Sequence, residues 1–184
     1  MKKNLLTGPT YLTIIRMMLS IVFMVFILIP ETWAKIVALA LFVIGSISDL
    51  IDGKWARKQK IVTDLGAFLD PLADKMLINL AFLTLTVLGM IPVWIFAIIL
   101  VRDFAVDGMR MMVARKGITI SASFYGKLKT TFQMIALIIL MLCLIIESNN
   151  ILIILGYIAL YAALVLTIFS GLDYLYKGWQ KINK

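Results

Sequence analysis

The sequence contains no histidine, a single cysteine and few charged residues. Without histidine, imidazole bases and histidine-containing metal sites are excluded. One cysteine cannot form a disulfide within the chain, and Cys143 lies in a long apolar run, where it is predicted to be a small buried hydrophobic residue. Proton transfer and metal binding must therefore depend on the ten Asp and Glu residues.

Charge is scarce because apolar residues dominate. Hydrophobic residues make up 62% of the 184 residues and charged residues 15%, whereas ordinary soluble domains are about 25% charged. This composition excludes a soluble globule and predicts an all-α, polytopic membrane protein. About 20 apolar residues span a bilayer core, and six segments are long enough. They are residues 9–30, 33–57, 65–88, 92–115, 122–146 and 151–176. No room remains for another domain, so residues 1–184 are predicted to form a single membrane domain.

The distribution of Lys and Arg predicts the orientation in the membrane. The links at 30–32, 89–91 and 147–150 hold no Lys or Arg, whereas the opposite ends of the segments hold most of them. Basic loops stay in the cytoplasm, so both ends of the chain are predicted to be cytoplasmic. The six segments would then be transmembrane helices of a protein in the cytoplasmic (plasma) membrane. The same rule explains the net charge of +8 without nucleic acid.

Half of the acidic residues lie between Asp49 and Asp74. Asp49 and Asp52 are spaced i, i+3 near the end of the second segment, and Asp70 and Asp74 are spaced i, i+4 near the start of the third, so each pair shares a helix face. A short loop makes these segments antiparallel neighbours, so the four carboxylates can converge. All-oxygen ligands suit Mg²⁺ or Mn²⁺, and four carboxylates can hold two ions. Because Pro71 follows Asp70, the third helix either begins near Asp70 or kinks there.

Small residues share these helix faces. Gly45, Gly53 and Ala56 line the second segment and Gly66 the third, which lets a flat ligand approach closely. Arg57 is placed to meet a phosphate oxygen. Two alternatives stay open: the acids could pair with nearby basic residues, and the glycines could serve helix packing alone.

One stretch resembles the complete signature of the CDP-alcohol phosphatidyltransferases: Asp49-x2-Asp52-Gly53-x2-Ala56-Arg57-x8-Gly66-x3-Asp70-x3-Asp74. The resemblance implies a six-helix membrane fold, a homodimer, and transfer of a phosphatidyl group from CDP-diacylglycerol to an alcohol with release of CMP. It implies that Asp49, Asp52, Asp70 and Asp74 hold two divalent metal ions, Mg²⁺ or Mn²⁺, and that Asp74 is also the general base. Gly53 and Ala56 would admit the cytidine and Arg57 a phosphate, in a polar cavity open to the cytosol.

The rest of the chain is similar to bacterial phosphatidylglycerophosphate synthases in residues 9–16, 102–110 and 126–133. Two positions depart from that pattern, since Asp103 stands where Glu is expected and Asp107 where a small hydroxyl residue is commoner. This resemblance implies that the acceptor is glycerol 3-phosphate and the product phosphatidylglycerol phosphate.

A phosphate dianion needs fixed cations, and three lie at the cytoplasmic ends of the fourth and fifth segments: Arg110, Lys127 and Lys129. For Lys129, an ordinary positive-inside charge is an equal alternative. Hydroxyl groups for the CDP-diacylglycerol and acceptor sites would come from Thr10 and Ser121, respectively.

Arg102 lies deeper than these cations. It either pairs with Asp103 or another acid in a structural role, or lines the polar cavity, and the sequence leaves both open.

Other functions make different predictions from the same residues. Another family member would use serine, inositol phosphate or phosphatidylglycerol as acceptor. An intramembrane prenyltransferase would carry Asp-rich motifs on two separated helix pairs, whereas this chain has one cluster. A divalent-cation transporter would place acids near the bilayer midplane, whereas Asp49 to Asp74 are predicted at cytoplasmic helix ends.

Overall fold

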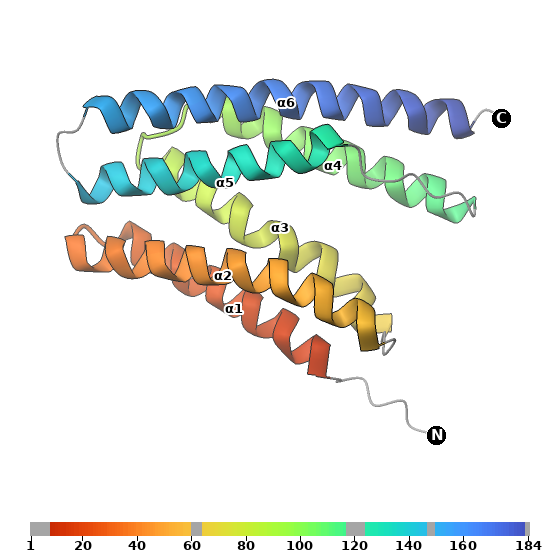
Figure 1. The fold of residues 1–184 in the computed structure, drawn as a ribbon, viewed down its shortest axis with the longest axis horizontal. Coiled ribbons are helices and arrows are strands. Elements are labelled where there is room, and N and C mark those ends of the chain that lie inside the picture. The colour runs from red at the N-terminus through yellow and green to blue at the C-terminus, as the bar shows by residue number, and fades with distance from the viewer. Residues whose placement is uncertain (1–7, 60–63, 117–123, 147–149, 183–184) are drawn as a thin grey trace. The chain divides into compact units, whose positions relative to one another are not determined.

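A computed structural model describes the backbone of residues 8–59, 64–116, 124–146 and 150–182, and the side chains of these ranges outside 8–10, 12, 49–59, 64–72, 74 and 182. Its elements are helices (Figure 1): α1 Gly8–Leu28, α2 Thr32–Gln59, α3 Asp64–Val87, α4 Val93–Arg115, α5 Phe124–Ile145 and α6 Asn150–Ile182. Each predicted segment is a helix with bounds within two residues of those expected, except that α6 continues to Ile182. Within the described ranges, the prediction of an all-α fold with six helices is confirmed. Of the two alternatives for the third helix, a start near Asp70 is wrong, because α3 begins at Asp64.

Contacts between helices divide the chain into two compact units, Met1–Leu88 and Gly89–Lys184. In the first unit, α1 packs against both α2 and α3, and α2 also contacts α3. In the second unit, α6 packs against both α4 and α5. In each unit, one helix therefore contacts the other two.

The core of the first unit is apolar and closely packed. The buried rings of Phe23 in α1 and Phe42 in α2 have centroids 5.8 Å apart. A Cβ atom on Gly45 would lie 2.8 Å from Leu77 Cδ2 and 3.1 Å from Leu19 Cδ2. Gly45 therefore lets the three helices approach one another, which is the packing role that the sequence left open for it.

The second unit begins at a tight turn. Gly89 adopts a φ of 74°, which only glycine takes without strain, and it follows the end of α3. Pro92 then precedes the first turn of α4, and its carbonyl accepts a hydrogen bond from the Ile95 amide at 3.0 Å. The Tyr157 hydroxyl of α6 donates to the Met90 carbonyl at 3.0 Å, so α6 holds this link in place.

Two helices, among the residues that the structure describes, are long and apolar enough to cross a membrane: Phe124–Ile145 and Asn150–Lys181. The second of these, α6, carries large exposed hydrophobic side chains that recur at helical spacing on one face along its length. They are Ile151, Ile154, Leu155, Ile158, Tyr161, Val165, Ile168, Phe169, Leu172, Tyr176 and Trp179. Such a continuous apolar stripe is costly in water and suits contact with lipid.

Candidate active site

The predicted metal ligands lie on two helices that contact each other. Asp49 and Asp52 belong to α2, and Asp70 and Asp74 belong to α3. Their side chains lie outside the described residues, as do those of four predicted CDP-diacylglycerol residues in these helices and of Thr10 in α1. These four residues are Gly53, Ala56, Arg57 and Gly66.

The donor chemistry of this set fits a hard divalent cation, because it consists of four carboxylates without nitrogen or sulfur ligands. Among the described side chains, no group of three Asp, Glu, His or Cys residues could hold a metal ion. The four aspartates on α2 and α3 stay the predicted ligands of a divalent cation.

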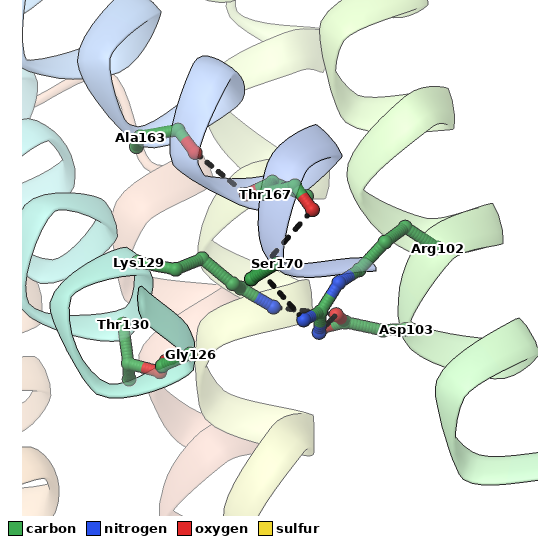
Figure 2. A network of polar contacts seen from close by, with 8 residues as sticks. All are labelled: Arg102, Asp103, Gly126, Lys129, Thr130, Ala163, Thr167 and Ser170. Carbon is green, nitrogen blue, oxygen red and sulfur yellow. Dashed lines mark hydrogen bonds and ion pairs between the residues drawn. The ribbon is translucent and has the colours of Figure 1, made fainter. Parts of the chain in front are cut away.

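The second unit contains a buried network of charged side chains that joins all three of its helices (Figure 2). Oδ1 of Asp103 in α4 accepts hydrogen bonds from Lys129 Nζ of α5 at 2.5 Å and from Arg102 Nη1 at 3.0 Å. The side chains are little exposed, at 15% for Arg102, 12% for Asp103 and 6% for Lys129. One carboxylate thus neutralises part of the charge of two buried cations.

Helix α6 completes the network with hydroxyl groups. Arg102 Nη2 donates to Ser170 Oγ at 2.8 Å, and Ser170 Oγ donates to the Thr167 carbonyl at 3.3 Å. Thr167 Oγ1 donates to the Ala163 carbonyl at 2.6 Å, so it is satisfied within its own helix. Figure 2 shows Ser170 between Thr167 and the Arg102 guanidinium. The network therefore ties α4 to α6 as well as to α5.

Two donors beside this network have no hydrogen-bond partner in the described part of the chain. They are Arg102 Nε and Gln133 Nε2, and Gln133 is one turn after Lys129 on the same face of α5. The ion pairs of the network thus join Arg102 and Lys129 to one carboxylate of α4 inside the helix bundle of the second unit.

The Arg110 side chain lies near the cytoplasmic end predicted for α4 and is exposed. Its Cζ lies 5.8 Å from the centroid of the Tyr174 ring, and its Nε donates to the Tyr174 hydroxyl at 3.5 Å. Lys127 in the first turn of α5 is also exposed. Both cations that were predicted to bind the acceptor phosphate are thus open to a ligand.

The model of the CDP-alcohol phosphatidyltransferase family matches residues 6–169, which is most of the chain. The chain belongs to this family. The resemblance carried by the Asp49 to Asp74 signature is thereby confirmed, and it extends over five complete helices and much of α6.

Relatives of this phosphatidyltransferase cover nearly its whole length. A CDP-diacylglycerol–glycerol-3-phosphate 3-phosphatidyltransferase of Bacillus subtilis is 34% identical over 95% of this chain and 96% of its own length. The protein of the same name from Rickettsia typhi is 38% identical over 94% of this chain and 95% of its own. A probable phosphatidylglycerophosphate synthase of Mycobacterium tuberculosis is 38% identical over 82% of this chain and 69% of its own.

The acceptor residues predicted for this phosphatidyltransferase differ in their exposure to solvent. Arg110 and Lys127 are exposed, whereas Lys129 is buried in the ion pair with Asp103. Ser121 lies outside the described residues. Arg102 pairs with Asp103, as one of the two alternatives predicts.

Sequence reasoning missed Ser170 and Tyr174, which hold Arg102 and Arg110. One signal for Ser170 was available, because Thr167 and Ser170 are polar residues spaced i, i+3 within an apolar run, and such residues often bond to neighbouring helices. Tyr174 gave no comparable signal, since aromatic residues are common near the ends of membrane helices.

Proposed function

We propose that the protein transfers the phosphatidyl group of CDP-diacylglycerol to glycerol 3-phosphate, giving phosphatidylglycerol phosphate and CMP. The observation that carries this proposal is the alignment of nearly the whole chain with proteins named for that reaction. Exposed Arg110 and Lys127 support it, because a phosphorylated acceptor needs cations within reach.

The reaction requires one proton transfer and one displacement at phosphorus. The attacking hydroxyl oxygen of the acceptor forms a bond to the phosphatidyl phosphorus, the bond from phosphorus to the CMP oxygen breaks, and CMP leaves with its electron pair. Asp74 takes the hydroxyl proton as general base. Two divalent ions, Mg²⁺ or Mn²⁺, would neutralise the pyrophosphate when bound by Asp49, Asp52, Asp70 and Asp74.

The remaining residues would bind the two substrates. Gly53 and Ala56 leave room for the cytidine because their side chains are small, and Arg57 binds a phosphate. Gly66 and Thr10 complete the CDP-diacylglycerol site. At the acceptor phosphate, Arg110 and Lys127 supply the direct contacts. Lys129 and Ser121 belong to the same predicted binding site.

The whole chain would act as one domain of six membrane-spanning helices in the cytoplasmic membrane, with a polar cavity open to the cytosol and both termini on that side. The apolar stripe of α6 and the two helices that meet the length requirement support this arrangement. Family membership further supports a homodimer.

The proposal is tested by CMP release from purified protein with CDP-diacylglycerol, glycerol 3-phosphate and Mg²⁺ or Mn²⁺. Wild-type protein should release CMP together with phosphatidylglycerol phosphate, identified by mass, and a chelator should stop both. Asp74→Asn should abolish turnover because it removes the base and one ligand, whereas the matched control Asp173→Asn changes an exposed aspartate of α6 and should be active. CMP release only with another alcohol would contradict the acceptor assignment, and none with any alcohol would contradict the reaction.

A further inference from the structure

The Arg110 guanidinium is held on one side by a residue of another helix. Its Cζ lies 5.8 Å from the centroid of the Tyr174 ring, within the range of cation–π attraction. Its Nε also donates to the Tyr174 hydroxyl at 3.5 Å. Both contacts come from the same side chain of α6, so Tyr174 restrains the edge of the guanidinium that carries Nε.

The Tyr174 side chain is held in place by its packing. Tyr174 is 5% exposed and packs in a buried cluster with Val106, Met109 and Val113 of α4. Arg110 itself is exposed, and an exposed arginine otherwise samples many rotamers. A buried and packed ring beside it therefore limits the directions in which Arg110 can point.

The contact leaves the two terminal nitrogens of Arg110 for another ligand. Within the described part of the chain, none of the carboxylates forms an ion pair with Arg110. A guanidinium held at Nε can still donate hydrogen bonds from both Nη groups to phosphate oxygens, as a bidentate donor.

We propose that Tyr174 is a positioning residue for the acceptor: it orients Arg110 so that the guanidinium binds the phosphate group of the acceptor alcohol. This inference rests on the proposed function, because it takes Arg110 as a contact to the acceptor phosphate. Tyr174 lies beyond residue 169, where the match to the family ends. The last part of α6 thus has a role in acceptor binding without itself touching the substrate.

The test measures Michaelis constants for both substrates in Tyr174→Leu and Tyr174→Phe. Loss of the ring in Tyr174→Leu should raise the KM for glycerol 3-phosphate about two- to fivefold, in line with a cation–π contact, and leave the KM for CDP-diacylglycerol unchanged. Tyr174→Phe keeps the aromatic face and should show a smaller rise. The matched control is Tyr176→Leu, which changes an exposed tyrosine two residues later and should alter neither constant.

A double variant distinguishes positioning from a structural role. If Tyr174 acts through Arg110, Tyr174→Leu should add nothing to the KM increase of Arg110→Gln, whereas independent effects would multiply and overturn the proposal. A raised KM in Arg110→Gln with normal constants in both Tyr174 variants would overturn the positioning role alone. Failure of the wild-type protein to release CMP with glycerol 3-phosphate would overturn the proposed function, and this role with it.

Discussion

Asp103 shares a single carboxylate oxygen between cations of two helices, Arg102 of α4 and Lys129 of α5. Both Arg102 and Lys129 contact Oδ1, and all three side chains are largely buried. Burying a cation among apolar side chains is costly unless an opposite charge is paired with it. Removal of this one negative charge would leave two buried cations close to each other.

Asp103→Asn should therefore lower the free energy of unfolding by about 3–5 kcal/mol, the usual cost of removing one partner of a buried ion pair. Thermal unfolding in detergent measures this change. Asp173→Asn is the control, because Asp173 pairs with Lys177 at 2.7 Å on the exposed surface of α6, where an i, i+4 pair contributes about 0.3–0.5 kcal/mol. Equal melting temperatures for the two variants would contradict the assignment of Asp103 as the charge that holds the network together.

Sequence separation explains which of these contacts could be predicted. Arg102 and Asp103 are adjacent, so the sequence offers their pairing as one of two alternatives. Lys129 is 26 residues from Asp103 and Ser170 is 68 residues from Arg102, and only the packing of α5 and α6 brings them together. The Asp49 to Asp74 signature could be recognised because its spacing lies within two neighbouring helices.

At the scale of the helix, α6 fits α4 through glycines that face side chains of α4. A Cβ atom on Gly171 would lie 2.7 Å from Arg102 Cγ, and one on Gly178 would lie 2.5 Å from Met109 Cγ. These positions are two helical turns apart, so they share one face of α6. The aliphatic stem of Arg102 therefore occupies space that exists only because residue 171 has no side chain.

Gly171→Ala should destabilise the protein by about 1–3 kcal/mol, because the added methyl group must displace Arg102 from a packed position. The measurement is the melting temperature in detergent, compared with that of Gly108→Ala. Gly108 also lies in a helix, α4, but a Cβ atom there would meet nothing within 4 Å. The control should be stabilised by about 0.5–1 kcal/mol through helix propensity, so the two changes should have opposite signs. A stabilised Gly171→Ala would contradict the close fit.

Helix bounds were predictable where apolar runs end at charges or turn residues. The end of α6 differs, since the helix continues from residue 176 to Ile182 through a mixed stretch with two lysines and a glutamine. The Asp173–Lys177 pair joins the last predicted turn to the first residue of this extension, and such pairs stabilise helices outside an apolar environment. An apolar run alone cannot indicate how far a membrane helix continues into water.

At the scale of the whole molecule, the two units place the predicted functional groups on different helices: the carboxylates on α2 and α3, and the acceptor cations on α4 and α5. Each of these helices was predicted to have its functional residues at a cytoplasmic end, because basic residues gather there. The orientation of every helix in the membrane is therefore a requirement of the proposed function and can be tested directly.

Cysteine labelling tests that orientation. In a Cys143→Ala background, single cysteines would replace Glu31 and Val93, which are exposed at the predicted outer side, and Arg115 and Lys181, which are exposed at the predicted inner side. A membrane-impermeant maleimide added to intact cells without an outer membrane should label positions 31 and 93 only, because basic helix ends stay in the cytoplasm. Inside-out vesicles should give the opposite pattern. Labelling of positions 31 and 181 from the same side would contradict the five spans predicted between them, α2 to α6. Labelling of positions 31 and 115 from the same side would contradict the alternation of α2 to α4.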